Sequence, residues 1–137
     1  MQADINFFAV IIGAVVNMIV GFVWYSPQAF GRQWMKAIGK TQKDFENMKG
    51  EANKAYALSF VGALVMSFVL AHVVYYSGST NLVEGFIIGF LVWLGFVAPI
   101  SFNSCLFEKK PLELVLINAG YYLAALIMMS IIISVMT

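Results

Sequence analysis

Four long apolar runs dominate the chain, at residues 5–25, 55–76, 83–107 and 112–136. An α-helix needs about 20 mainly apolar residues to cross about 30 Å of hydrocarbon, and each run is long enough. Backbone groups in lipid must be paired within the protein, and none of the runs alternates strictly between apolar and polar residues as a barrel strand does. The runs therefore predict an all-α integral membrane protein with four transmembrane helices, in a single domain over residues 1–137.

The composition fits a chain that is surrounded by lipid. Hydrophobic residues make up 61% of the sequence and charged residues only 11%, whereas soluble domains average about 25% charged residues. The formal net charge is +1, and the chain offers no basic stripe on a water-soluble face. We therefore expect membrane lipids as partners and no binding to nucleic acid.

All eight lysine and arginine residues lie in two of the connections between the runs. Six follow the first run and two precede the fourth: Arg32, Lys36, Lys40, Lys43, Lys49 and Lys54, then Lys109 and Lys110. Connections rich in lysine and arginine remain on the cytoplasmic side of a membrane, while neutral ones cross it. Both basic connections are therefore predicted inside and both termini outside.

The segment after the first run has a pattern of its own. Pro27 is expected to end the first helix after Ser26. Phe30, Trp34 and Ile38 then recur at helical spacing opposite Arg32, Lys36 and Lys40. This pattern predicts a short helix that lies in the cytoplasmic interface and stops at Gly39, with an irregular charged loop as the alternative.

A second helical start follows within the same connection. Thr41 and Asp44 have the spacing of a capping box, which pairs the first free N–H groups of a helix. We expect the helix that begins there to continue through Phe45 and Met48 into the second span.

Polar and helix-breaking residues inside the runs mark the predicted cytoplasmic half. Asn17, Asn103 and Asn118 all fall there, and Tyr121 lies one turn after Asn118. An unpartnered amide in hydrocarbon costs about 2–7 kcal/mol, so the asparagines are expected to face one another or to face water. Pro99 is expected to kink the third helix and to free a carbonyl one turn earlier. Two alternatives stay open, an interhelical hydrogen-bond cluster and a polar cavity open to the cytoplasm.

Small residues recur on one face of several runs. The second run carries five at a spacing of four, namely Ala55, Ser59, Ala63, Ser67 and Ala71, and the third run opens with Gly85 and Gly89. Small side chains allow membrane helices to approach closely. The stripes predict tight packing, against a helix of the same chain or of another copy.

The single histidine suggests a separate hypothesis at the opposite face. His72 lies about one turn from the outer end of the second span and Glu84 opens the third, so the two side chains are candidates for a pH-sensing pair. Alternatively, Glu84 interacts only with the dipole of its own helix. Cys105 is predicted at the other face, which excludes a Cys–His nucleophile pair. We found no metal-ligand or phosphate-loop pattern and expect no catalytic residue, metal or cofactor.

Two groups of motifs resemble a known family. The first is Gly21-Phe-Val-Trp24-Tyr25-Ser26-Pro27, followed by Phe30-Gly31 and Trp34; the second is Gly95-Phe-Val-Ala98-Pro99, followed by Leu106-Phe-Glu108 and Gly120-Tyr121. Both resemble the signature of a bacterial membrane family catalogued as domain of unknown function 1761. The resemblance implies a four-helix protein of the bacterial inner membrane and implies no reaction. His72 and Glu84 lie outside these motifs.

Three functional hypotheses follow. The first is a non-enzymatic homo-oligomer or accessory subunit of a larger membrane complex, whose inner end is held together by Trp24–Pro27, Asn103 and Asn118. The second is an oligomeric channel or transporter for a small ion or solute. The third is an enzyme that acts on lipid or quinone at the cytoplasmic interface. The candidate binding or cavity-lining residues are Asn17, Trp24, Tyr25, Ser26, Pro27, Pro99, Asn103, Asn118 and Tyr121.

Overall fold

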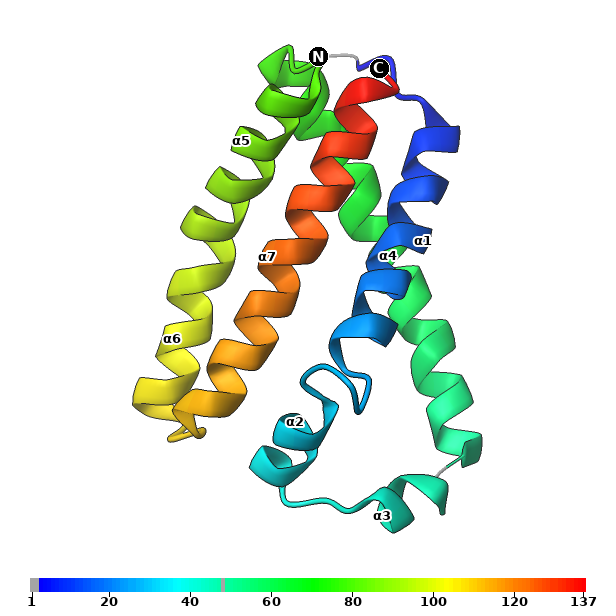
Figure 1. Cartoon of the computed structure of the whole chain (residues 1–137). Coiled ribbons are helices and arrows are strands. Elements are labelled where there is room, and N and C mark those ends of the chain that lie inside the picture. The colour runs from blue at the N-terminus through cyan, green and yellow to red at the C-terminus, as the bar shows by residue number, and fades with distance from the viewer. Residues whose placement is uncertain (1–2, 48) are drawn as a thin grey trace.

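The computed structural model describes residues 3–47 and 49–137, and every element in them is helical (Figure 1). The elements are α1 (Phe7–Trp24), α2 (Gly31–Ile38), α3 (Gln42–Glu46), α4 (Lys49–Ser77), α5 (Leu82–Val92), the π-helical turn η1 (Trp93–Val97), α6 (Ala98–Phe107) and α7 (Leu112–Val135). Through η1, α5 and α6 form one continuous helix. Four helices are therefore long and apolar enough to cross a membrane, which confirms the predicted all-α class.

The connection between α1 and α4 contains a short helix at the predicted residues, and its location in the cytoplasmic interface stays a prediction. Helix α2 ends at Gly39, whose φ of 74° is in the left-handed region that favours glycine. The Thr41 N–H then donates to Oδ2 of Asp44 (2.9 Å), and the Asp44 N–H donates to Oγ1 of Thr41 (3.4 Å), so the capping box is present at α3.

The prediction of one helix from Thr41 into the second span is wrong. Helix α3 ends at Glu46 and α4 begins at Lys49, with Asn47 in a turn between them. Asn47 lies in this break and Gly50 is the second residue of α4, and both residue types have low helix propensity. Met48, which we placed in the same helix, lies outside the described residues.

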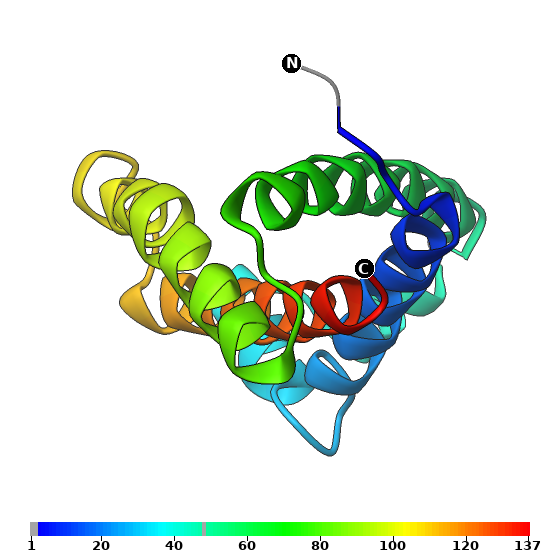
Figure 2. The ribbon, with the colours of Figure 1, turned by 90° about the horizontal axis from the view of Figure 1, so that it is seen from above.

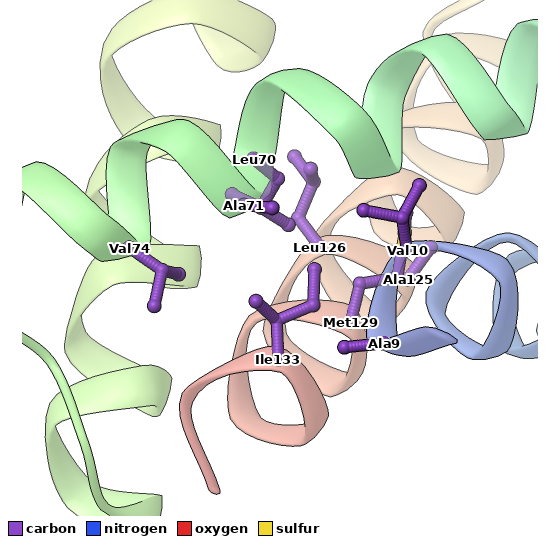
Figure 3. Close-up of a cluster of buried hydrophobic side chains, with 9 residues drawn as sticks. All are labelled: Ala9, Val10, Leu70, Ala71, Val74, Ala125, Leu126, Met129 and Ile133. Atoms are coloured by element: carbon purple, nitrogen blue, oxygen red, sulfur yellow. The ribbon is translucent and has the colours of Figure 1, made fainter. Parts of the chain in front are cut away.

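Helix α7 lies at the centre of the bundle and packs most extensively against α5 and α1, while α1 also packs against α4 (Figure 2). The buried apolar core occupies the half of the bundle that holds both termini. Figure 3 shows its nine members, from α1, α4 and α7: Ala9, Val10, Leu70, Ala71, Val74, Ala125, Leu126, Met129 and Ile133.

Close packing between helices occurs where the small residues predicted it. A Cβ atom at Gly89 would lie 2.7 Å from Cα of Ile127, so only glycine allows α5 to approach α7 this closely. On α4, Ala63, Ser67 and Ala71 are buried, but Ala55 and Ser59 of the same stripe are exposed. The chain therefore covers only the second half of the α4 stripe.

The ends of the bundle differ in charge. Both termini and the α4–α5 connection lie at one end, while α2, α3 and the α6–α7 connection lie at the other (Figure 1). Nδ2 of Asn6 donates to the Met136 carbonyl (3.1 Å) and joins the two terminal segments. The segments with lysine and arginine thus share one end, as the topology requires; the compartment that each end faces stays a prediction.

Candidate functional site

The chain reverses direction where α1 ends, in the Trp-Tyr-Ser-Pro motif. Phe30 N–H donates to the Trp24 carbonyl (3.0 Å), and Gly31 N–H donates to the Ser26 carbonyl (2.9 Å). The Ser26 hydroxyl donates to the Val23 carbonyl at 2.7 Å. A side chain at Gly31 would collide with the carbonyl groups of Tyr25 and Ser26. The tight turn therefore explains why Phe30-Gly31 follows the Trp-Tyr-Ser-Pro motif at this spacing.

This reversal of the chain places the Trp24 side chain against α7. Its indole Nε1 donates to the Ile117 carbonyl at 2.9 Å, and its ring lies 4.7 Å from that of Phe30, centroid to centroid. A Cβ atom at Gly120 would be only 2.8 Å from Cζ2 of Trp24. Gly120 therefore provides the space that this indole occupies.

Two tyrosines satisfy the side-chain oxygens of two of the predicted asparagines. The Tyr25 hydroxyl donates to Oδ1 of Asn118 at 2.6 Å, and the Tyr121 hydroxyl donates to Oδ1 of Asn17. The rings of Tyr25 and Tyr121 contact each other at 5.5 Å, and Trp34 packs edge-on against Tyr25 at 5.3 Å. Asn17 and Asn118 are thus joined through a pair of touching tyrosines.

Asn17 is packed inside the protein, with only 3% of its surface exposed. Its Nδ2 atom lies 3.5 Å from the Met129 sulfur and 3.7 Å from the Met66 sulfur. Thioether sulfur is a weak acceptor. Both polar atoms of the Asn17 side-chain amide therefore have protein partners, although the contacts of Nδ2 with sulfur are weak.

We call this assembly the aromatic junction, and define it as Asn17, Trp24, Tyr25, Phe30, Trp34, Asn118, Gly120 and Tyr121. It fastens the end of α1 and the start of α2 to the first half of α7. Its residues pair with one another, which is the behaviour of an interhelical cluster. The role of these residues in binding stays a prediction.

The third span departs from α geometry just ahead of Pro99, where the sequence predicted a break. The Ala98 N–H donates to the Trp93 carbonyl, five residues earlier, which is the spacing of a π-helix. Proline has no N–H and disturbs the preceding turn, and one π-turn lets the helix continue past it. Trp93 also donates from Nε1 to the Ala119 carbonyl at 2.8 Å.

Sequence reasoning missed Trp93. It lies in the middle of an apolar run, where an indole N–H has no water to bond, and that position was the available signal.

Asn103 does not join the other two asparagines; it is exposed on α6. The physical reason is the π-turn. In an unbroken α-helix, Asn103 would lie about five turns after Gly85 and on the same face, which packs against α7. The extra residue of η1 shifts that face by one position, so the half-buried Ser104 takes the inward place. Of the two expectations for the asparagines, mutual contact is therefore wrong for this residue, and contact with water stays a prediction.

The remaining candidates have local partners. Nδ1 of His72 donates to the Phe68 carbonyl at 2.8 Å. Glu84 accepts from the Thr80 N–H (3.1 Å) and from Nδ2 of Asn81 (2.9 Å), which caps α5. Within the described residues, no hydrogen bond or ion pair joins His72 to Glu84, and a pH-sensing role stays a prediction. Pro27 and Pro99 are both exposed.

The comparisons with known proteins identify the family. No curated protein and no solved structure matches the chain. A family model described as "Protein of unknown function (DUF1761)" matches residues 8–134, which run from α1 into the last turns of α7 and include both the aromatic junction and η1. The resemblance first suggested by the Trp-Tyr-Ser-Pro and Gly-Phe-Val-Ala-Pro motifs is confirmed, and the chain belongs to the DUF1761 family.

Proposed function

We propose that this protein is a non-enzymatic, multi-pass subunit of the bacterial inner membrane that assembles with further copies of itself, with both termini outside. The observation that carries the proposal is the exposed amide of Asn103 on α6. An amide that faces hydrocarbon without a partner costs about 2–7 kcal/mol. A helix of a neighbouring copy would supply the hydrogen-bond partner that the described part of this chain does not provide.

A second surface supports self-assembly. Ala55 and Ser59 continue the small-residue stripe of α4 beyond the part that packs inside the chain. A Cβ atom at the neighbouring Gly62 would have no atom within 4 Å. Small residues on an open helix face allow the close approach of another helix.

The two open surfaces lie at opposite edges of the molecule, α6 at one edge and the first half of α4 at the other (Figures 1 and 2). Contact between different surfaces of identical subunits is head-to-tail, and it closes into a ring when the rotation allows. We therefore infer that Ser59 of one copy lies near Asn103 of the next.

The aromatic junction favours this function over the two alternatives. A channel or transporter with the asparagines in its vestibule needs their amides to face water, whereas Asn17 is buried and bonded to Tyr121. A lipid or quinone enzyme at the interface would use Tyr25, whose hydroxyl is bonded to Asn118. Both contacts suit a structural cluster that holds α1 to α7.

Cysteine cross-linking tests the head-to-tail arrangement. Ser59→Cys and Asn103→Cys are made separately in a Cys105→Ser background, with tags of different size, and co-expressed. Mild oxidation of native membranes is expected to give a mixed disulfide-linked pair. The control replaces Ser59→Cys by Val61→Cys, which is exposed on α4 but lies on another face.

Two results would contradict the proposal. One is a Val61→Cys pair that forms as efficiently as the Ser59→Cys pair. The other is a single photobleaching step per particle when subunits of the fluorescently labelled protein are counted in membranes, because one step means one copy. If disulfides form only between two Asn103→Cys copies, the protein still self-assembles, but the copies are related by a two-fold axis and not head to tail.

A further inference from the structure

A groove lies between α2 and the first turns of α7, at the charged end of the bundle. It has a volume of about 410 Å³ and is lined by Phe30, Gln33, Leu112, Glu113, Leu116 and Ile117. Small-molecule sites in proteins typically measure about 300–1,000 Å³. The groove is therefore large enough for part of an amphiphile.

The lining is mainly apolar. Four of the six residues are hydrophobic, and Leu112 and Leu116 remain more than half exposed. Glu113 starts at the connection before α7, and Ile117 lies four residues further along, about 6 Å deeper along the helix axis. The groove thus leads from a carboxylate near the connection to an apolar wall about one turn further along α7.

Glu113 is exposed and has no partner among the residues that the structure describes. Within residues 3–47 and 49–137, no hydrogen bond or ion pair reaches its carboxylate, whereas the nearby Glu108 is paired with Lys110 at 3.2 Å. Arg32 is exposed next to Gln33 in α2, and Lys109 is exposed just before α7. The groove therefore presents one unpaired anion; its lining contains no basic residue, and Arg32 and Lys109 are sequence neighbours of that lining.

This charge pattern complements a zwitterionic headgroup. An ammonium group is attracted to the Glu113 carboxylate, and the phosphate beside it would lie at the end of the bundle where Arg32 and Lys109 are exposed (Figure 1). A purely anionic headgroup would meet the Glu113 carboxylate with the wrong sign. The apolar wall of Leu116 and Ile117 suits an acyl chain.

We propose that this groove binds a phospholipid with a primary-amine headgroup, with the ammonium on Glu113 and an acyl chain along Leu116 and Ile117. The site is formed by α2 and α7 of one chain. It does not depend on whether copies of the protein assemble.

Native mass spectrometry tests the site. The purified full-length protein is exposed to equal amounts of phosphatidylethanolamine and phosphatidylglycerol with identical acyl chains. We expect the wild type to prefer phosphatidylethanolamine by about threefold to fivefold, the size expected for one partly exposed ion pair. Glu113→Gln is expected to abolish the preference. Glu108→Gln, which removes a carboxylate outside the groove, is expected to keep it.

A second variant separates headgroup recognition from the groove itself. Leu116→Trp fills the apolar wall at an exposed position, and it is expected to reduce the binding of both lipids while leaving the thermal unfolding midpoint unchanged. Equal binding of the two lipids by the wild type would overturn the proposal. A preference for phosphatidylethanolamine that survives Glu113→Gln would also overturn it. A third contrary result concerns Leu116→Cys: if this cysteine is protected from labelling only in the cross-linked oligomer, the groove is covered by a second copy.

Discussion

The Tyr25 hydroxyl donates a hydrogen bond of 2.6 Å to Oδ1 of Asn118, a residue 93 positions later in the chain. This contact joins the motif at the end of α1 to the second turn of α7. Next to it, Trp24 donates to the Ile117 carbonyl. The geometry of one turn thus aligns two adjacent side chains with two adjacent positions on the central helix.

We expect Tyr25 and Asn118 to be energetically coupled. Tyr25→Phe and Asn118→Leu are each expected to lower the free energy of unfolding, with a coupling energy of about 0.6 kcal/mol and at most about 1.7 kcal/mol, the range for hydrogen bonds between membrane helices. Thermal or denaturant unfolding in detergent measures the double-mutant cycle. If Asn118→Leu keeps both the oligomeric state and the wild-type stability, Asn118 does not hold this end of the bundle together.

Gly120→Ala is expected to destabilise the protein by about 1–3 kcal/mol, because the new methyl group overlaps the Trp24 ring. Gly50→Ala, in the first turn of α4, is the matched control. A Cβ atom there meets nothing within 4 Å, and alanine has the higher helix propensity, so stability is expected to stay level or rise by up to about 1 kcal/mol. The two variants are compared by their thermal unfolding midpoints, measured in the same detergent. Equal losses would show that the indole is not seated over Gly120.

The capping box at α3 predicts a pH dependence outside the spans. Hydrogen bonds from the Thr41 backbone N–H and hydroxyl hold the pKa of Asp44 below its ordinary value of 3.8. Ionised Asp44 therefore stabilises the start of α3 at any pH above that value, and the stabilisation is lost as the pH falls through the lowered pKa. The protection factor for hydrogen exchange at the Thr41 amide, which corrects for the intrinsic rate at each pH, is expected to fall in that acidic window. Asp44→Asn should remove the pH dependence, and an unchanged profile in that variant would assign it to another group.

Labelling tests the orientation of the bundle. Lys43→Cys and Lys110→Cys, each in a Cys105→Ser background, are expected to react with an impermeant maleimide from the same side of the membrane, the cytoplasmic side. Thr137→Cys, at the other end of the bundle, is expected to react from the opposite side. Intact cells and inverted vesicles distinguish the two sides. Labelling of positions 43 and 110 from different sides would rule out the four-span topology.

The sequence determined by itself the features that depend on local chemistry. Four apolar runs of sufficient length predicted the four long helices, because helix formation satisfies the backbone within each run. Gly39 and the Thr41–Asp44 pair predicted a helix stop and a helix start from contacts within a few residues. The basic connections predicted which loops share one end of the bundle. Each of these depends on interactions with near neighbours or on the solvent.

Tertiary structure decided which polar groups meet. The π-turn before Pro99 moved Asn103 to the outside, and a periodicity argument that assumes a uniform helix cannot anticipate a one-residue shift. The partners of Asn17 and Asn118 turned out to be tyrosines on other helices, because the angle and depth of helix packing select the contacts. Packing also covered Ser67 and left Ser59 of the same stripe exposed. Such choices depend on the whole arrangement of helices, which no single stretch of residues specifies.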